Sequence, residues 1–376
     1  MTCAGAGWNS RDIAARALDD AARATRDRLM SLSSEEINLI TLVAKQYYFE
    51  GRTQNEISDS LNLSRTKISR MLKQSRELGL VSIRINLNPV ELSDLGQELR
   101  RRFGIRHALI AIDHEDEELQ RAAVAQLVAD HLAEILSDGM VVAVGMGRNL
   151  GAVADLAHSA RQRACTFVSA IGGTNRVGDK LNSDSICRKL ASKLGGMSEM
   201  LYAPACVEDP QLRSLLMKND TVKQALTRAR RADVALLGIG DCTENGYMAN
   251  IGWYSPVEIA RARLSGAVAD VSGYDFLDIR GQRVALELGD RIIGLSHADY
   301  ARIPNVIAVV SEQNKTLSLL ASLRSGVIDT LATSAGNAHA ILAIDDRQAA
   351  ATEHGDKNGG QDALAAAPSG DSPPRA

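Results

Sequence analysis

The chain has 376 residues, of which 45% are hydrophobic, and its 43 Lys and Arg against 46 Asp and Glu leave a net charge of −3. This length exceeds one small DNA-binding module and predicts a second domain of roughly 250 residues with a large core. Five cysteines without paired spacing argue against a zinc finger or a disulfide framework, and no apolar run approaches the ~20 residues of a membrane span, so we expect a cytoplasmic protein without metal, cofactor or membrane contact.

The first predicted elements precede a tight turn. Residues 1–32 are rich in Ala, Arg and Asp and are expected to form an N-terminal extension. Residues 40–51 have the spacing of an amphipathic helix that Gly51 ends, and Thr53 is placed to cap the next helix. These elements predict the first part of a three-helix domain over residues 33–89.

Residues 54–72 predict a helix-turn-helix, because their apolar positions suit two short helices that cross at a turn. Asn62 lies at the turn, and Asn accepts positive φ better than most residues. Ser64 can cap the second helix. The inward-facing residues are expected to be Ile57, Leu61, Leu63, Ile68, Met71 and Leu72.

The exposed face of the second helix carries donors suited to phosphates and base edges of duplex DNA. Residues 65–84 contain six basic residues against one acidic residue, in a chain that is slightly negative overall. The residues expected to bind DNA are Gln54, Ser64, Arg65, Thr66, Lys67, Ser69 and Arg70. Residues 80–87 alternate apolar and polar side chains, as a wing strand would. The alternative is an ordinary surface hairpin of two amphipathic helices.

Residues 90–104 predict a helix with Leu92, Leu95, Leu99 and Phe103 on one face, either a linker or a dimerisation helix. From residue 105 onward, short β-branched runs alternate with helical stretches, which predicts a parallel-sheet α/β domain over residues 105–345. The candidate strands are residues 108–112, 140–144, 166–171, 234–239, 291–295 and 306–310. Residues 346–376 are rich in Ala, Gly, Ser, Asp and Pro and predict a disordered tail.

Two glycine-containing loops follow predicted strands and lead towards helices, where backbone amides can bind a phosphate. The first contains Gly145, Gly147, Arg148 and Asn149, and the second is residues 172–175. The glycines can also be simple strand-to-helix turns. A dinucleotide site is a weaker alternative, because the spacing is G-x-G-x-x-x-G and no acidic residue follows at the expected distance.

Several segments together resemble the SorC family of bacterial sugar-responsive transcription regulators, over residues 36–344. They are the helix-turn-helix, the two glycine loops, A-P-A at residues 203–205, G-I-G at 238–240, G-A-V-A-D at 266–270, and the helix start that contains Lys315. The resemblance implies an effector domain similar to ribose-5-phosphate isomerase and CoA-transferase folds. It also implies sensing of a phosphorylated sugar or polyol without turnover, usually by a homotetramer on a palindromic operator in double-stranded DNA.

The resemblance also implies the effector-binding residues, which are Gly145, Gly147, Arg148, Asn149, Gly172, Gly173, Thr174, Asn175, Asp270 and Lys315. Relatives commonly have a Gly pair where this chain has Ser311 and Glu312. A carboxylate there would repel an anion, so Glu312 points away or the effector is less charged than usual. The alternative function is a sugar-phosphate isomerase with a fused DNA-binding domain, in which Asp270, Glu312 or Lys315 would transfer protons.

Overall fold

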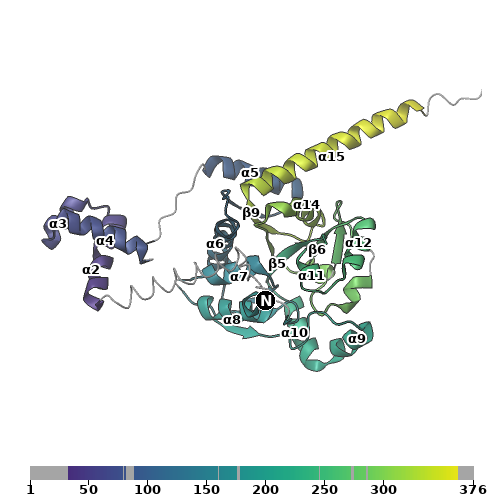
Figure 1. Ribbon diagram of the computed structural model, residues 1–376, viewed down its shortest axis with the longest axis horizontal. Helices are drawn as coiled ribbons and strands as arrows, with labels where there is room; N and C mark the ends of the chain where they lie inside the picture. The colour runs from purple at the N-terminus through teal and green to yellow at the C-terminus, as the bar shows by residue number, and fades with distance from the viewer. Residues whose placement is uncertain are drawn as a thin grey trace, which may run out of the picture. The chain divides into compact units, whose positions relative to one another are not determined.

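The computed structural model describes residues 33–78, 80–81, 89–159, 161–175, 178–244, 246–271, 275–284 and 287–362. The chain divides into two compact units, Met1–Asn86 and Leu87–Ala376, each with its own hydrophobic core (Figure 1). The expected extension, residues 1–32, and nearly all of the expected wing strand lie outside the described residues. No helix in the described ranges is long and apolar enough to cross a bilayer.

The described part of the first unit is helical. Its elements are α2 (Ser34–Ala44), a π-helical segment (Lys45–Phe49), α3 (Gln54–Leu61) and α4 (Arg65–Glu77). Ser33 and Thr53 begin α2 and α3 with capping boxes, in which the hydroxyl accepts from a backbone amide of the first turn and a glutamate returns to the cap. The buried apolar side chains are Ile40, Val43, Ile57, Ile68, Met71, Leu72 and Leu78.

The turn between α3 and α4 confirms the helix-turn-helix prediction. Asn62 ends α3 in the left-handed conformation, with φ 53° and ψ 42°, and is the non-glycine residue with positive φ in the described part of the chain. The hydroxyl of Ser64 accepts a hydrogen bond from the amide of Lys67 and caps α4. The hydroxyl of Ser58 donates to the carbonyl oxygen of Leu63, which fixes the turn against α3.

The second unit is an α/β domain around a mainly parallel sheet, as the sequence predicted. Its strands are β1 (His107–Ala111), β2 (Val141–Val144), β3 (Thr166–Ser169), β4 (Met197–Glu199), β5 (Val234–Asp241), β6 (Ala267–Val271), β7 (Asp275–Asp278), β8 (Val306–Val309) and β9 (Thr330–Ser334). Its longer helices are α5 (Pro89–Phe103), α6 (Glu117–Ile135), α7 (Arg148–Leu156), α8 (Ser183–Leu194), α9 (Pro210–Lys218), α10 (Asp220–Arg230), α12 (Pro256–Leu264), α14 (Thr316–Arg324) and α15 (Ala335–Asp362).

Short helical turns complete the second unit. They are α11 (Tyr247–Asn250), α13 (His297–Tyr300) and 3₁₀ segments at Asp179–Leu181, Glu287–Arg291 and Gln313–Lys315. The sheet order is β1-β9-β8-β5-β2-β3-β4, with parallel pairing throughout this path. The carboxyl ends of these strands therefore meet at one edge. The end of β5 continues past this edge and pairs with β6 in antiparallel register, and β6 pairs with β7.

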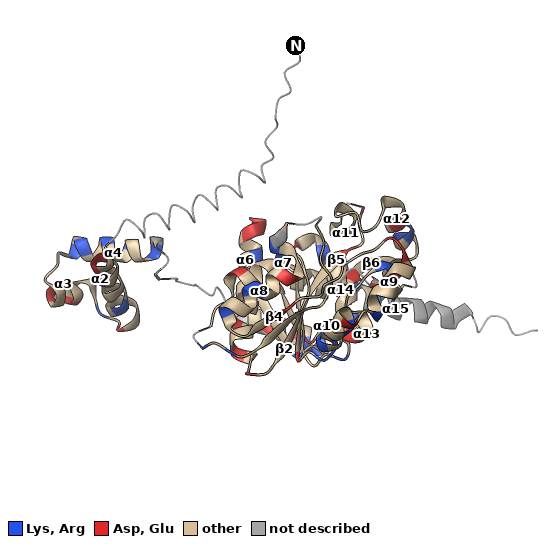
Figure 2. Ribbon diagram, turned by 90° about the horizontal axis from the view of Figure 1, so that it is seen from below, with Lys and Arg blue, Asp and Glu red and all other residues tan. Residues whose placement is uncertain are grey.

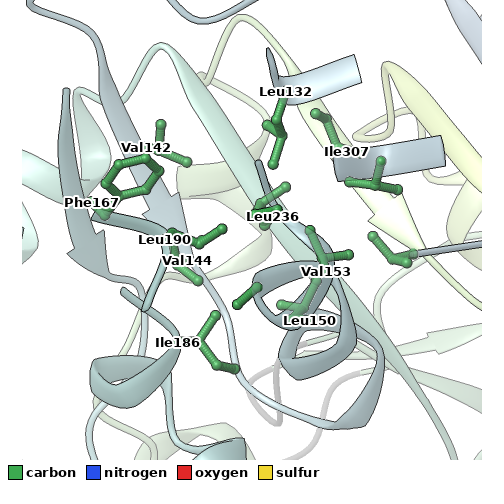
Figure 3. Packing of buried hydrophobic residues seen from close by; sticks show 14 of the residues in the cluster. Leu132, Val142, Val144, Leu150, Val153, Phe167, Ile186, Leu190, Leu236 and Ile307 are labelled. Carbon is green, nitrogen blue, oxygen red and sulfur yellow. The ribbon is translucent and has the colours of Figure 1, made fainter. Parts of the chain in front are cut away.

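Successive side chains of a strand point to opposite sides, and here both sides are apolar, so helices cover both faces of the sheet. On β2, Val142 and Val144 pack with α6, α7 and α8, as Figure 3 shows, whereas Ala143 joins a second cluster with α10 on the other face. A third cluster brings α5, α14 and α15 onto β1, β8 and β9. The sheet is thus a rigid platform whose carboxyl edge presents loops.

The two ends of the second unit differ from the sequence-based boundaries. Leu95 and Leu99 of α5 are buried in the core of the second unit, so this helix is part of the α/β domain. At the other end, α15 continues to Asp362, whereas the sequence predicted a disordered tail from residue 346. Arg324 contributes to this difference, because it pairs with Asp345 and hydrogen-bonds Gln348 on α15. Residues 363–376 lie outside the described ranges.

Five of the six predicted strands are confirmed, and residues 291–295 are wrong as a strand. Ile292 and Gly294 instead form isolated antiparallel bridges with Cys206 and Ile171 in neighbouring loops. Ile292 and Ile293 are buried between these loops and the sheet, which explains why the sequence of this segment is as apolar as that of a strand. Strand β9 was not predicted, because its sequence T-L-A-T-S is largely polar although all five residues are buried.

Candidate functional site

The exposed surface of α4 is basic. Arg65 and Arg70 are exposed, together with Thr66 and Ser69, while Lys67 is half-buried and Ile68 between them is buried in the core. Figure 2 shows Lys and Arg at intervals along α4, whereas α3 carries acidic residues. Most of the predicted DNA-binding residues on α4 are therefore exposed, whereas the apolar residues of the same helix are buried in the core of the first unit. Gln54, at the start of α3, is half-buried.

The second unit contains a pocket at the carboxyl edge of its sheet, with about 650 Å³ of empty space that includes open solvent. The loops after β2, β5 and β8 contribute to it, and so does β6. The lining residues are Gly145, Met146, Gly147, Arg148, Asn149, Leu150, Ile171, Gly238, Ile239, Gly240, Tyr247, Met248, Asp270, Glu312 and Lys315. We call it the edge pocket.

Two glycines shape the turn from β2 into α7. A Cβ on Gly145 would lie 3.0 Å from the carbonyl oxygen of Leu236 and 3.1 Å from Cδ1 of Leu150. Gly147 has φ 115°, which only glycine adopts readily. No side chain caps α7, and residues 147–150 at its start line the edge pocket, so the positive end of its dipole lies beside the pocket. This arrangement suits an anion or hydrogen-bond acceptors.

Glu312 lies inside the edge pocket and does not point away from it. Its side chain is 10% exposed. Its carboxylate accepts a hydrogen bond from Nδ2 of Asn149 at 2.9 Å and lies 3.5 Å from Nζ of Lys315 and 3.7 Å from Nη2 of Arg148. Burial opposes ionisation of Glu312, but the charge of Lys315, the hydrogen bond from Asn149 and the charge of Arg148 outweigh it, and the pKa of Glu312 is lowered.

Asp270 is 1% exposed and lines the edge pocket from β6, where it pairs with Gly240 of β5. A Cβ on Gly240 would lie 2.5 Å from Oδ2 of Asp270. The absence of a side chain at Gly240 therefore makes room for the carboxyl group. Lys315 approaches from the start of α14, and its Nζ donates to the carbonyl oxygen of Ile239 at 3.0 Å.

The phenol of Tyr247 is a further polar group in the edge pocket that the sequence analysis missed. Its hydroxyl oxygen is buried, and no hydrogen-bond partner for it exists among the described residues. Burial raises the pKa of Tyr247 to about 12, so the hydroxyl stays protonated and can donate. The sequence signal that could have identified Tyr247 is its position in the loop that follows the predicted strand end at residues 238–240, because this loop lies at the same edge of the sheet.

The second predicted loop does not join the first in the edge pocket. Three of its amides donate within the protein, from Gly172 to the carbonyl of Ile293, from Gly173 to the carbonyl of Ala203, and from Thr174 to Oδ1 of Asn182. Gly173, Thr174 and Asn175 line a separate pocket with Trp253 and Arg291. Of the predicted effector residues, the edge pocket therefore brings together Gly145, Gly147, Arg148, Asn149, Asp270 and Lys315.

Comparison with known proteins agrees with this architecture. The family model described as "Putative sugar-binding domain" matches residues 88–343, well over half of the chain. The crystal structure of the full-length sorbitol operon regulator SorC from Klebsiella pneumoniae is 26% identical, with TM-score 0.74, and the match covers 82% of this chain and all of that one. The chain belongs to the SorC family. The resemblance predicted from the sequence is confirmed, and so is the class of sugar-responsive regulators.

Other relatives of this SorC-family chain support the same assignment. The transcriptional regulator LsrR from Enterobacter sp. (strain 638) is 28% identical over 334 residues, which are 87% of this chain and 99% of the relative. A structure described as "Putative Sugar-Binding Domain of Transcriptional Repressor from Vibrio fischeri" is 46% identical, with TM-score 0.63, over 68% of this chain and 99% of that one. Both are named as transcription factors, and neither is named as an enzyme.

Proposed function

We propose that the chain controls a sugar or polyol catabolic operon, and that a sugar or polyol, free or phosphorylated, binds in the edge pocket and changes operator affinity. The observation that carries this proposal is the presence, in one chain, of a helix-turn-helix unit with a basic face and a separate α/β unit with a polar pocket at its sheet edge. A ligand shifts operator binding if it favours one arrangement of the regulator over another.

The proposed DNA contacts come from α3 and α4 and comprise Gln54, Ser64, Arg65, Thr66, Lys67, Ser69 and Arg70. Arg70 lies in the second turn of α4 on its exposed face, where an arginine can reach a guanine edge or a phosphate. A base contact would give specificity at one operator position, whereas a phosphate contact would affect all sequences alike. The proposed partner is double-stranded DNA with two half-sites separated by whole turns of ~10 base pairs.

The proposed effector contacts are those of the edge pocket. Arg148, Asn149 and Lys315 offer donors, and Asp270 offers acceptors to vicinal hydroxyls. Gly145 and Gly147 allow the backbone to approach the ligand. Gly172, Gly173, Thr174 and Asn175 remain in the proposal only as an outer contact for a longer ligand, because three of them line a separate pocket.

We place the function in binding rather than catalysis. An isomerase needs a general base whose pKa lies near the working pH. The pKa of Glu312 is lowered, and its carboxylate is engaged by Asn149 and Lys315, which makes it a poor base. The curated relatives support this proposal by their names as regulators. The proposed regulator is a cytoplasmic homotetramer that needs no cofactor. Paired operator half-sites require at least a dimer.

The test is fluorescence anisotropy of the full-length protein on its own upstream DNA at fixed salt, with and without a panel of free and phosphorylated sugars and polyols. Arg70→Ala should weaken operator binding by roughly 1–3 kcal/mol and leave ligand affinity unchanged. Lys315→Ala should leave binding to DNA intact and reduce the response to ligand. The reverse pattern would contradict the assignment of roles to the two units, and turnover of a sugar phosphate would favour the isomerase alternative.

A further inference from the structure

The edge pocket contains its own anion. Glu312 follows β8 and precedes α14, and its carboxylate lies among the groups that would otherwise bind a phosphate, namely Arg148, Asn149 and Lys315. Arg148 and Asn149 begin α7, whereas Lys315 lies three residues after Glu312, so two segments of the sheet edge meet at this carboxylate. A resident negative charge therefore already offsets part of the positive charge of the pocket.

This carboxylate is held in place by a buried network. Asn149 is 6% exposed, its Nδ2 donates to Glu312 at 2.9 Å and to the carbonyl oxygen of Val309 at 3.2 Å, and its Oδ1 accepts from Oγ of Ser311 at 2.7 Å. Because the carbonyl oxygen of Val309 and the carboxylate of Glu312 can only accept, Asn149 presents its amide N–H groups to both of them and its oxygen to the hydroxyl of Ser311. Rotation of Glu312 out of the pocket would leave the amide nitrogen of Asn149, which has two N–H groups, with the carbonyl oxygen of Val309 as its remaining acceptor in this network.

Charge and hydrogen bonding then decide which chemical form of a ligand fits. Arg148, Lys315, Glu312 and Asp270 all line this pocket, so it contains two cationic side chains and two carboxyl groups. A phosphate beside Glu312 would meet like charge in a partly buried site, where screening is weak. A hydroxyl would instead donate to the carboxylate, and the hydroxyl of Tyr247 can accept or donate to a second ligand hydroxyl.

We propose that Glu312 is a specificity-determining residue, which makes the edge pocket select an uncharged sugar or polyol over its phosphate. This inference rests on the proposed function and deepens it by naming the chemical form of the effector. It is independent of which sugar is sensed, because it concerns the charge that the ligand presents to Arg148, Asn149 and Lys315. Ser311 and Glu312 belong to one network, in which Ser311 donates to Asn149, Asn149 donates to Glu312, and Glu312 offsets the charge of the nearby cations.

The experiment compares full-length wild type with Glu312→Gln, which has the same shape without the charge. Glu312→Asp keeps the charge, and Glu134→Gln removes one exposed carboxylate from α6 outside the pocket. Isothermal titration calorimetry measures affinity for matched pairs of pentoses, hexoses and polyols, each as the free compound and as its monophosphate. Inorganic phosphate is titrated separately, because its binding reports the charge of the pocket without the need for a correct sugar. Thermal melting establishes that each variant is folded.

Wild type should bind the free member of a pair more tightly than its phosphate and should bind inorganic phosphate weakly. Glu312→Gln should shift the ratio towards phosphate by about 10- to 100-fold and should strengthen binding of inorganic phosphate by about 10-fold or more, as expected for removal of one nearby like charge. Glu312→Asp and Glu134→Gln should retain the wild-type ratio. An unchanged ratio and unchanged phosphate binding in Glu312→Gln would overturn the inference while the proposed function stands. If no sugar pair binds any variant, the proposed function fails, whereas the inorganic phosphate series still decides the role of Glu312.

Discussion

Gly240 offers a test of the edge pocket, because its replacement by alanine places a methyl group against Asp270. The added Cβ would lie 2.5 Å from Oδ2, 3.2 Å from Cγ and 3.3 Å from Cβ of Asp270, and the first distance is far inside van der Waals contact. Asp270 is 1% exposed and is paired with Gly240 across β5 and β6, so the strand pairing holds the two residues against each other. The carboxyl group must therefore rotate into the pocket or the strand pair must separate.

Overpacking of this kind costs about 1–3 kcal/mol. In a domain of some 250 residues, each kcal/mol lowers the melting temperature by roughly 2–4 °C. Gly240→Ala should therefore melt earlier and lose most of its stabilisation by effector, because Asp270 no longer has its position in the pocket. Differential scanning calorimetry of the full-length protein with and without effector measures both changes. Operator affinity without effector should be unchanged, since the helix-turn-helix unit has a separate core.

Gly178→Ala is the matched control. A Cβ at Gly178 would meet no atom within 4 Å, and its backbone does not require positive φ. This variant should melt and bind as wild type does. If Gly240→Ala matched Gly178→Ala in melting temperature and in effector response, the close contact with Asp270 would not matter and the assignment of Asp270 to the pocket would be refuted.

Two further predictions concern the turn and the pocket carboxylate. Asn62→Ala should destabilise the helix-turn-helix by about 1 kcal/mol because φ is 53° there, whereas Asn62→Gly should not. Hydrogen exchange of the α3 and α4 amides in the full-length protein measures both effects. Equal protection in the two variants would contradict the role of the left-handed turn. The folded-state pKa of Glu312 lies below its ordinary value of 4.5, so ionised Glu312 contributes stability above about pH 4.5 that is lost as pH falls through the lowered pKa. Urea denaturation should show wild type more stable than Glu312→Gln at pH 7, with the difference shrinking below pH 4.5; a difference that grew on acidification would be inconsistent with the lowered pKa.

The helix-turn-helix could be predicted from sequence because its determinants are local. Asn62 supplies the left-handed turn and Ser64 the cap, and both act on residues fewer than five positions away. Strand β9 could not be predicted in this way. Thr330 and Thr333 are fully buried there, and the hydroxyl of Thr330 donates to Oδ1 of Asn305, which is 25 positions away in the sequence. A polar residue that finds its partner through tertiary structure is indistinguishable from a loop residue in the sequence.

The candidate site shows the same division. The loop from Gly145 to Asn149 was predicted because glycines after a strand carry a local pattern. The position of Glu312 was left between two possibilities, and only its distances to Arg148 and Lys315 show that it lies inside the pocket. Whether residues 172–175 share that pocket depended on packing of a separate loop against Ile293 and Ala203, which no sequence spacing reports.

The separate cores of the two units have a consequence for how such regulators can be rebuilt. Among the residues that the structure describes, the core that contains Ile57, Ile68 and Leu72 draws only on the first unit, so the proposed DNA-binding unit can be exchanged at residue 86 with its core intact. The α/β unit in turn builds its pocket from segments that are far apart in the sequence, among them residues 145–150 and 238–240, Glu312 and Lys315, so it must be transplanted whole. Recombination at this boundary would give chimeric biosensors that report one metabolite from different promoters. Gene fusion in nature can diversify these proteins by the same route.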